Sequence, residues 1–114
     1  MDIEELRKIC TALPNVTEDI KWEHDLCFCI AGKMFCITGF QQPMCVSLKV
    51  KEEEFDELCA TGGIIPAPYL ARYKWILVTD VNRFTKKEWK HYITQSYQLV
   101  KEKLPKKILK ELEG

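Results

Sequence analysis

The alternation of side chains from Leu26 onward restricts this chain to folds that contain an antiparallel sheet. The segments "LCFCI" and "KMFCITGF" alternate with a period of two and flank Ala31-Gly32, a pair typical of a tight hairpin turn. With a two-residue turn, Phe28 lies opposite Phe35, and Leu26 lies opposite Ile37. The core side is then expected to carry the large apolar residues, which are Leu26, Phe28, Ile30, Phe35 and Ile37. The other side is expected to carry Cys27, Cys29, Met34, Cys36 and Thr38.

Two further segments are predicted to extend this sheet. The segment "MCVSLKV" alternates again, so Met44, Val46, Leu48 and Val50 are expected to face the core, opposite to Cys45, Ser47 and Lys49. In "KWILVTDV", Ile76 and Val78 are expected to face the core, with Trp75, Leu77 and Thr79 on the other side. A short edge strand is expected near residues 20–22. The loop "IIPAPYLARY" contains two prolines and therefore forms no long regular strand.

Four segments are predicted to be helical. Apolar residues recur at helical spacing in residues 3–13 after the capping residue Asp2, and a second helix is expected over residues 52–60. Thr85 and Glu88 form a capping-box pattern that begins a long helix, and a short helix follows Pro105. The order of elements predicts a single α+β domain over residues 1–114. It is a two-layer sandwich of the form α-β(3)-α-β(1-2)-α, with helices on one face of an antiparallel sheet.

The overall charge excludes one class of function. Seventeen basic and seventeen acidic residues cancel, so the chain is not expected to bind nucleic acid through its overall charge, and a local basic patch would be needed. No segment has the length and apolar character of a membrane span, and no secretion signal begins the sequence, so we expect a cytoplasmic protein with no membrane role. Six cysteines without a C-x-x-C pair are then expected to be reduced thiols.

No arrangement of residues typical of catalysis is present, so the chain is not expected to be an enzyme. His24 and His91 lie in different elements, and both are expected at the surface. No glycine-rich phosphate loop occurs, and no cofactor is expected. The thiols of Cys27, Cys29, Cys36 and Cys45 are four possible zinc ligands, and simple packing of these thiols on the sheet is the alternative. Packing is favoured, because side chains on a flat sheet stand parallel rather than converging on a metal.

Basic and aromatic residues give the one positive functional indication. Lys33 lies at the hairpin turn, Lys49 on the outer side of the third strand, and Arg72 and Lys74 in an aromatic loop. Lysine and arginine neutralise phosphates while bases stack on aromatic rings, so this interleaving suits nucleic acid. The alternative is that the aromatic loop only packs against the sheet.

An ordered set of short motifs resembles the MmcQ/YjbR family. These motifs are "LP" at Leu13-Pro14, "GKMF" at 32–35, "SLKV" at 47–50, a tyrosine six residues before Trp75, "SYQLV" at 96–100 and "LPKK" at 104–107. The resemblance spans nearly the whole chain. It implies the same α+β fold and a small bacterial protein that binds DNA through a double-wing motif. It also implies roles for Lys33, Lys49, Tyr69 and Trp75.

One position departs from the family pattern, and one alternative function stays open. Leu70 stands where the family often has a histidine after the tyrosine, although Arg72 and Lys74 keep positive charge nearby. The expected DNA-binding residues are Lys33, Lys49, Tyr69, Arg72, Lys74 and Trp75. The expected partner is DNA. The alternative partner is a protein or peptide, because the implied fold is similar in layout to secretion chaperones.

Overall fold

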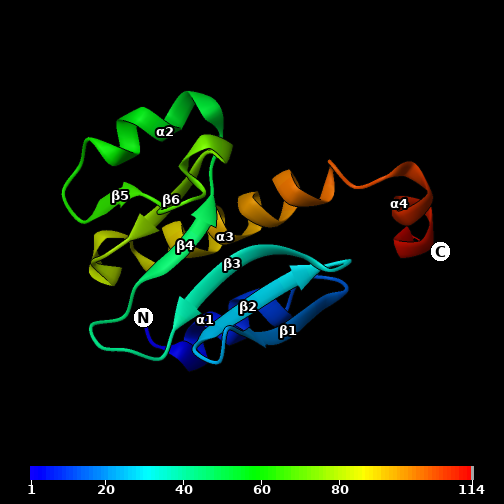
Figure 1. The fold of residues 1–114 in the computed structure, drawn as a ribbon, viewed down its shortest axis with the longest axis horizontal. Coiled ribbons are helices and arrows are strands. Elements are labelled where there is room, and N and C mark those ends of the chain that lie inside the picture. Colours follow the sequence, from blue (N-terminus) through cyan, green and yellow to red (C-terminus); the bar gives the residue numbers. More distant parts are fainter. Residues whose placement is uncertain (114) are drawn as a thin grey trace.

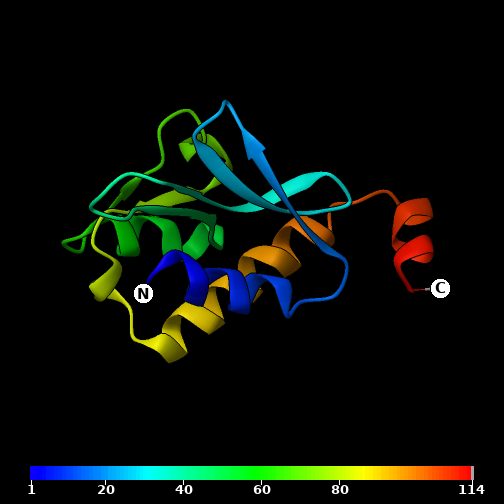
Figure 2. The ribbon, with the colours of Figure 1, turned by 90° about the horizontal axis from the view of Figure 1, so that it is seen from below.

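A computed structural model describes residues 1–113 and shows one antiparallel sheet with helices packed against one of its faces (Figures 1 and 2). The six strands lie in the order β1-β2-β3-β4-β6-β5. The strands are β1 (Val16–Lys21), β2 (Asp25–Ile30), β3 (Lys33–Gly39), β4 (Val46–Lys49), β5 (Ile64–Pro66) and β6 (Trp75–Val78). The helices are α1 (Ile3–Thr11), α2 (Glu52–Cys59), α3 (Lys86–Lys101) and α4 (Lys106–Glu113), with 3-10 turns η1 (Ala71–Tyr73) and η2 (Val81–Arg83). The predicted two-layer α+β fold is confirmed.

The helices begin where the sequence predicts. The Asp2 carboxylate accepts a hydrogen bond from the amide of Glu5 at 2.8 Å, which caps α1. Thr85 and Glu88 form the predicted capping box at the start of α3, with each side chain accepting the other residue's backbone N–H. Within residues 1–113, no helix combines the length and the apolar character needed to cross a membrane.

The core lies between the sheet and the helices α1, α2 and α3. Phe35 of β3 meets Tyr97 of α3 edge to face, with 5.5 Å between the ring centroids. Trp89 is buried and its indole N–H donates to the carbonyl of Val81 at 3.0 Å, so its one polar group is satisfied. Met44, Val46, Leu48, Val50, Ile76 and Val78 are all buried on this side, as predicted.

The predicted pairing of β2 with β3 is correct near the turn and wrong beyond it. Ile30 pairs with Lys33 across the two-residue turn, as predicted, but Phe28 pairs with Cys36 and Leu26 pairs with Thr38. A β-bulge causes the shift, because Phe35 is an extra residue that has no partner on β2.

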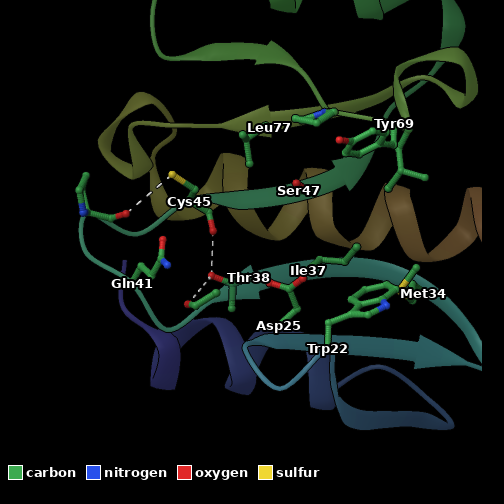
Figure 3. Close-up of a pocket in the computed structure, with 14 residues that line it drawn as sticks. Trp22, Asp25, Met34, Ile37, Thr38, Gln41, Cys45, Ser47, Tyr69 and Leu77 are labelled. Carbon is green, nitrogen blue, oxygen red and sulfur yellow. Dashed lines mark hydrogen bonds between the residues drawn. The ribbon is translucent and has the colours of Figure 1, made fainter.

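The bulge also changes which residues of β3 reach the core. Phe35 and Cys36 are both fully buried in the core, whereas Ile37 lies on the opposite face of the sheet (Figure 3). The predictions that Ile37 faces the core and that Cys36 faces away from it were therefore wrong. One extra residue reverses the facing of every later residue in a strand, because the side chains alternate with a period of two.

The first strand is longer than predicted. We expected a short edge strand near residues 20–22, but β1 (Val16–Lys21) pairs with β2 along its whole length. Four strands rather than three therefore precede α2. The apolar content of β1 is low because it is an edge strand, and four of its six residues are exposed, so alternation of apolar side chains could not reveal it.

Ser96 joins the helical layer to the sheet. Its buried hydroxyl donates to the carbonyl of Phe35 at 2.6 Å and accepts from the amide of Lys49 at 2.9 Å. It thereby satisfies backbone groups of both β3 and β4 in the interior.

We expect Ser96→Ala to lower the free energy of unfolding by about 2 kcal/mol, because two buried backbone groups would lose their partner. Chemical denaturation would measure the change, and Thr94→Ala, at an exposed position of the same helix, is the control. A loss no larger than that of the control would show that these hydrogen bonds do not stabilise the protein.

Candidate nucleic-acid interface

Two loops rise from the face of the sheet that the helices leave open. One is the turn between β1 and β2, residues 22–24, and the other is the connection between β5 and β6, residues 67–74 (Figure 2). We call the second segment the 67–74 loop. These two loops border a hollow on the open face of the sheet.

The open-face pocket has a volume of about 700 Å³ and lies over β3, β4 and β6 (Figure 3). It is lined by Trp22, Asp25, Met34, Ile37, Thr38, Gly39, Gln41, Pro43, Cys45, Ser47, Pro68, Tyr69, Leu70 and Leu77. Its volume is within the range of pockets that bind small molecules. Most of the lining side chains are apolar, and none is a lysine or arginine.

Two aromatic residues stand on opposite sides of the open-face pocket (Figure 3). Tyr69 is 97% exposed and Trp22 is 62% exposed, so neither ring contributes much to the core. Both have left-handed backbone conformations, with φ of 65° at Tyr69 and 53° at Trp22. Such a conformation costs a residue with a side chain on the order of 1 kcal/mol or more. Two large apolar rings are thus held in solvent at some cost to stability, which is typical of binding surfaces.

The polar groups of the open-face pocket are few. The hydroxyl of Thr38 donates to the carbonyl of Cys45 at 2.8 Å and is therefore already paired. The side chains of Asp25, Gln41 and Ser47 make no hydrogen bond to any of residues 1–113. Asp25 lies between Thr38 and Trp22 in Figure 3, and it is the only charged residue in the lining.

A second hollow, smaller and basic, lies beside the first. This basic hollow has a volume of about 260 Å³, and five cationic side chains line it with one carboxylate, that of Glu52. The cations are Lys49, Lys51, Arg72, Lys74 and Lys103. They come from the end of β4, the start of α2, the 67–74 loop and the turn after α3. A chain with no net charge thus gathers a local positive patch.

The cations of the basic hollow are held by neutral groups. Arg72 donates to the hydroxyl of Tyr73 at 2.9 Å, and Lys74 lies 4.9 Å from the ring centroid of Phe55. The ammonium of Lys49 donates to the carbonyl of Tyr73. Within residues 1–113, the only ion pairs are those of Arg7, on α1.

Lys49 is partly buried and lies near a second cation, Lys103. Burial lowers the pKa of Lys49 from its ordinary value, and the positive charge of Lys103 lowers it further. An anion bound in the basic hollow would relieve that repulsion. The arrangement therefore suits a ligand with negative charges.

Comparison with known proteins agrees with this fold. The YjbR family model matches residues 11–99, which is most of the chain. The chain belongs to the YjbR family. No curated protein matches it.

Two solved structures resemble this YjbR protein over most of its length. A Deinococcus radiodurans protein with the domain DUF419 has a TM-score of 0.88 and 28% sequence identity, covering 97% of this chain and 87% of its own. A Pseudomonas syringae protein has a TM-score of 0.72 and 22% identity, covering 87% of this chain and 98% of its own. The second likeness concerns the fold alone.

The structure brings together some of the residues that the sequence singled out in this YjbR protein. Lys49, Arg72 and Lys74 line the basic hollow, and Tyr69 lines the open-face pocket. Leu70, which replaces the histidine frequent in the family pattern, also lines that pocket. The 67–74 loop thus borders both hollows.

Two of the predicted site residues lie elsewhere. Trp75 is only 6% exposed, and its backbone bonds hold the 67–74 loop, with the amide of Ala67 donating to its carbonyl at 3.0 Å. Its side chain is therefore largely inaccessible to a ligand. Lys33 is exposed at the turn between β2 and β3 and lines neither hollow.

Four residues that line the two hollows were not predicted from the sequence. They come from three separate segments of the chain, and they are Trp22, Asp25, Lys51 and Lys103.

The four thiols considered as a zinc site do not share one face. A hydrogen bond with the Cys10 thiol, and then burial, raise the pKa of Cys36, which lies on the core side of the sheet. Burial raises the pKa of Cys27 to about 11, which disfavours the thiolate that binds zinc. Within residues 1–113, no three potential ligands lie close enough together to hold a metal ion.

The two histidines lie at the surface. His24 and His91 are both exposed, as predicted.

Proposed function

We propose that this YjbR protein is a DNA-binding protein that uses the open face of its sheet and the 67–74 loop. The observation that carries the proposal is that one loop connects five cations, none of them in an ion pair among residues 1–113, with a pocket flanked by two exposed aromatic rings. Phosphates would occupy the basic hollow. Bases would contact Tyr69 and Trp22.

An unpaired strand suits this surface better than a regular duplex. Aromatic side chains stack on the faces of bases, and those faces are covered in a duplex but accessible in a single strand. Tyr69 and Trp22 belong to the two loops that rise above the sheet, and their exposed side chains could meet such faces (Figure 3). We therefore expect single-stranded DNA to bind more tightly than duplex DNA of the same length.

The test is a titration of fluorescently labelled single-stranded and duplex DNA at low salt, followed by anisotropy. We expect Arg72→Gln/Lys74→Gln to weaken binding about tenfold or more, because two phosphate contacts would be lost. The control is Lys87→Gln/Lys90→Gln, which removes the same charge from exposed positions of α3 on the helical side.

Two outcomes would contradict the proposal. One is the absence of binding to either form of DNA at low salt. The other is an equal loss of affinity in both double variants, which would mean that only the net charge matters and that the 67–74 loop has no special role.

A further inference from the structure

The open-face pocket has the composition of a site for a flat, largely apolar group. Its floor carries Met34, Ile37 and Leu77, and the exposed rings of Trp22 and Tyr69 stand on either side (Figure 3). Planar ligands bind well between an apolar floor and aromatic rings, since both surfaces of the ligand lose water. A nucleobase is such a group.

Asp25 defines which edge of a base this pocket can bind. Its carboxylate is half-buried and makes no hydrogen bond or ion pair within residues 1–113, although Lys21 is its cross-strand partner on β1. An ionised carboxylate only accepts hydrogen bonds, and desolvating it without a donor is costly. A ligand in this pocket must therefore supply N–H or O–H groups to Asp25.

Among the four DNA bases, guanine supplies the best match. Its N1–H and its N2 amino group lie side by side on one edge and can donate to the two oxygens of one carboxylate. Adenine and cytosine present an amino group next to an acceptor nitrogen, which a carboxylate repels. Thymine presents one N–H between two carbonyl oxygens, which is less favourable still.

We propose that the open-face pocket binds one guanine base of a DNA strand, with Asp25 accepting from N1–H and N2–H. This inference rests on the proposed function, because the strand's phosphates would occupy the adjoining basic hollow. The 67–74 loop connects the two, with Tyr69 at the base and Arg72 and Lys74 at the phosphates. A pocket with one carboxylate thus suits a base, and a hollow with five cations suits the phosphates of the same strand.

The test compares oligothymidylates that differ in one central base, either guanine, hypoxanthine, adenine or thymine. Hypoxanthine keeps N1–H but lacks the N2 amino group, so it isolates one hydrogen bond. We expect the guanine strand to bind about tenfold more tightly than the hypoxanthine strand, because hypoxanthine loses one hydrogen bond to a charged group. All four strands carry the same number of phosphates.

Variants then separate the base site from the phosphate site. Asp25→Asn should remove the preference for guanine over hypoxanthine, because the carboxylate that accepts the second hydrogen bond is lost. Arg72→Gln/Lys74→Gln should weaken all four strands by the same factor. Arg72→Gln/Lys74→Gln would then still prefer the guanine strand, although it binds every strand more weakly than the wild-type protein does.

Equal affinities for guanine and hypoxanthine strands would overturn the inference and leave the proposed DNA binding intact. If no strand binds, the proposed function is overturned. Titration with the nucleoside guanosine then tests whether the open-face pocket binds guanine without a DNA strand. Changes in NMR chemical shift that are confined to residues of the open-face pocket, and that do not occur in Asp25→Asn, would support a guanine site. No change, or tighter binding of a lysine-containing peptide that displaces guanosine, would overturn it.

Discussion

Replacing Phe35 by alanine is expected to lower the free energy of unfolding by about 3–5 kcal/mol, the usual cost of removing a fully buried aromatic ring. Phe35 is completely buried and packs edge to face on Tyr97. Ile37→Ala is expected to cost less than about 2 kcal/mol, because Ile37 is half-buried on the open face rather than in the core. Urea denaturation of both variants would measure the difference.

This pair of variants tests the β-bulge directly. Without the bulge, Phe35 and Ile37 would face the same side of the sheet, and both substitutions would empty space in the core. Comparable losses from the two substitutions would therefore show that β3 keeps the uninterrupted register. The slope of unfolding free energy against urea should stay the same in both variants, so that the comparison concerns stability alone.

The sequence predicts the fold well because the helices and central strands carry strong local signals. Asp2, Thr85 and Glu88 cap helices through hydrogen bonds between residues three apart, and such contacts are visible in the sequence itself. The core-facing residues of β4 and β6 follow the simple alternation. For these elements the local pattern and the tertiary packing favour the same structure.

The bulge and the first strand could not be predicted by the same reasoning. Nothing in "KMFCITGF" shows that Phe35 is the extra residue of a bulge. Phe35 and Ile37 are both apolar, so the strand would place a large apolar side chain in the core with the bulge or without it. The choice depends on packing against α3, where the ring of Phe35 meets Tyr97. Likewise β1 is largely solvated, so its pairing with β2 and not its own composition makes it a strand.

The candidate site was only partly predictable because it is assembled from distant segments. Arg72 and Lys74 stand out in the sequence as charges within an aromatic loop. Lys51 and Lys103 do not, since they lie in charged segments that read as ordinary solvated surface. Trp22 and Asp25 acquire significance only when the sheet brings them across from Tyr69.

Binding of single-stranded DNA is expected to depend steeply on salt. If the five cations of the basic hollow each neutralise a phosphate, the logarithm of the affinity should fall with the logarithm of the salt concentration with a slope of about −3.5. Between 50 and 200 mM salt the affinity should then fall roughly a hundredfold. Anisotropy titrations at four or five salt concentrations would give the slope.

The variants should change this slope in proportion to the contacts they remove. Arg72→Gln/Lys74→Gln is expected to make it shallower by roughly 1.4, the effect of two phosphates on a single strand, whereas Lys87→Gln/Lys90→Gln should leave it unchanged. A wild-type slope near zero would contradict phosphate binding in the basic hollow. The ratio of affinities for guanine and hypoxanthine strands should not depend on salt, because the two strands carry the same phosphates and differ only at the base. A salt-dependent slope together with a salt-independent ratio would thus assign charge neutralisation to one hollow and base recognition to the other.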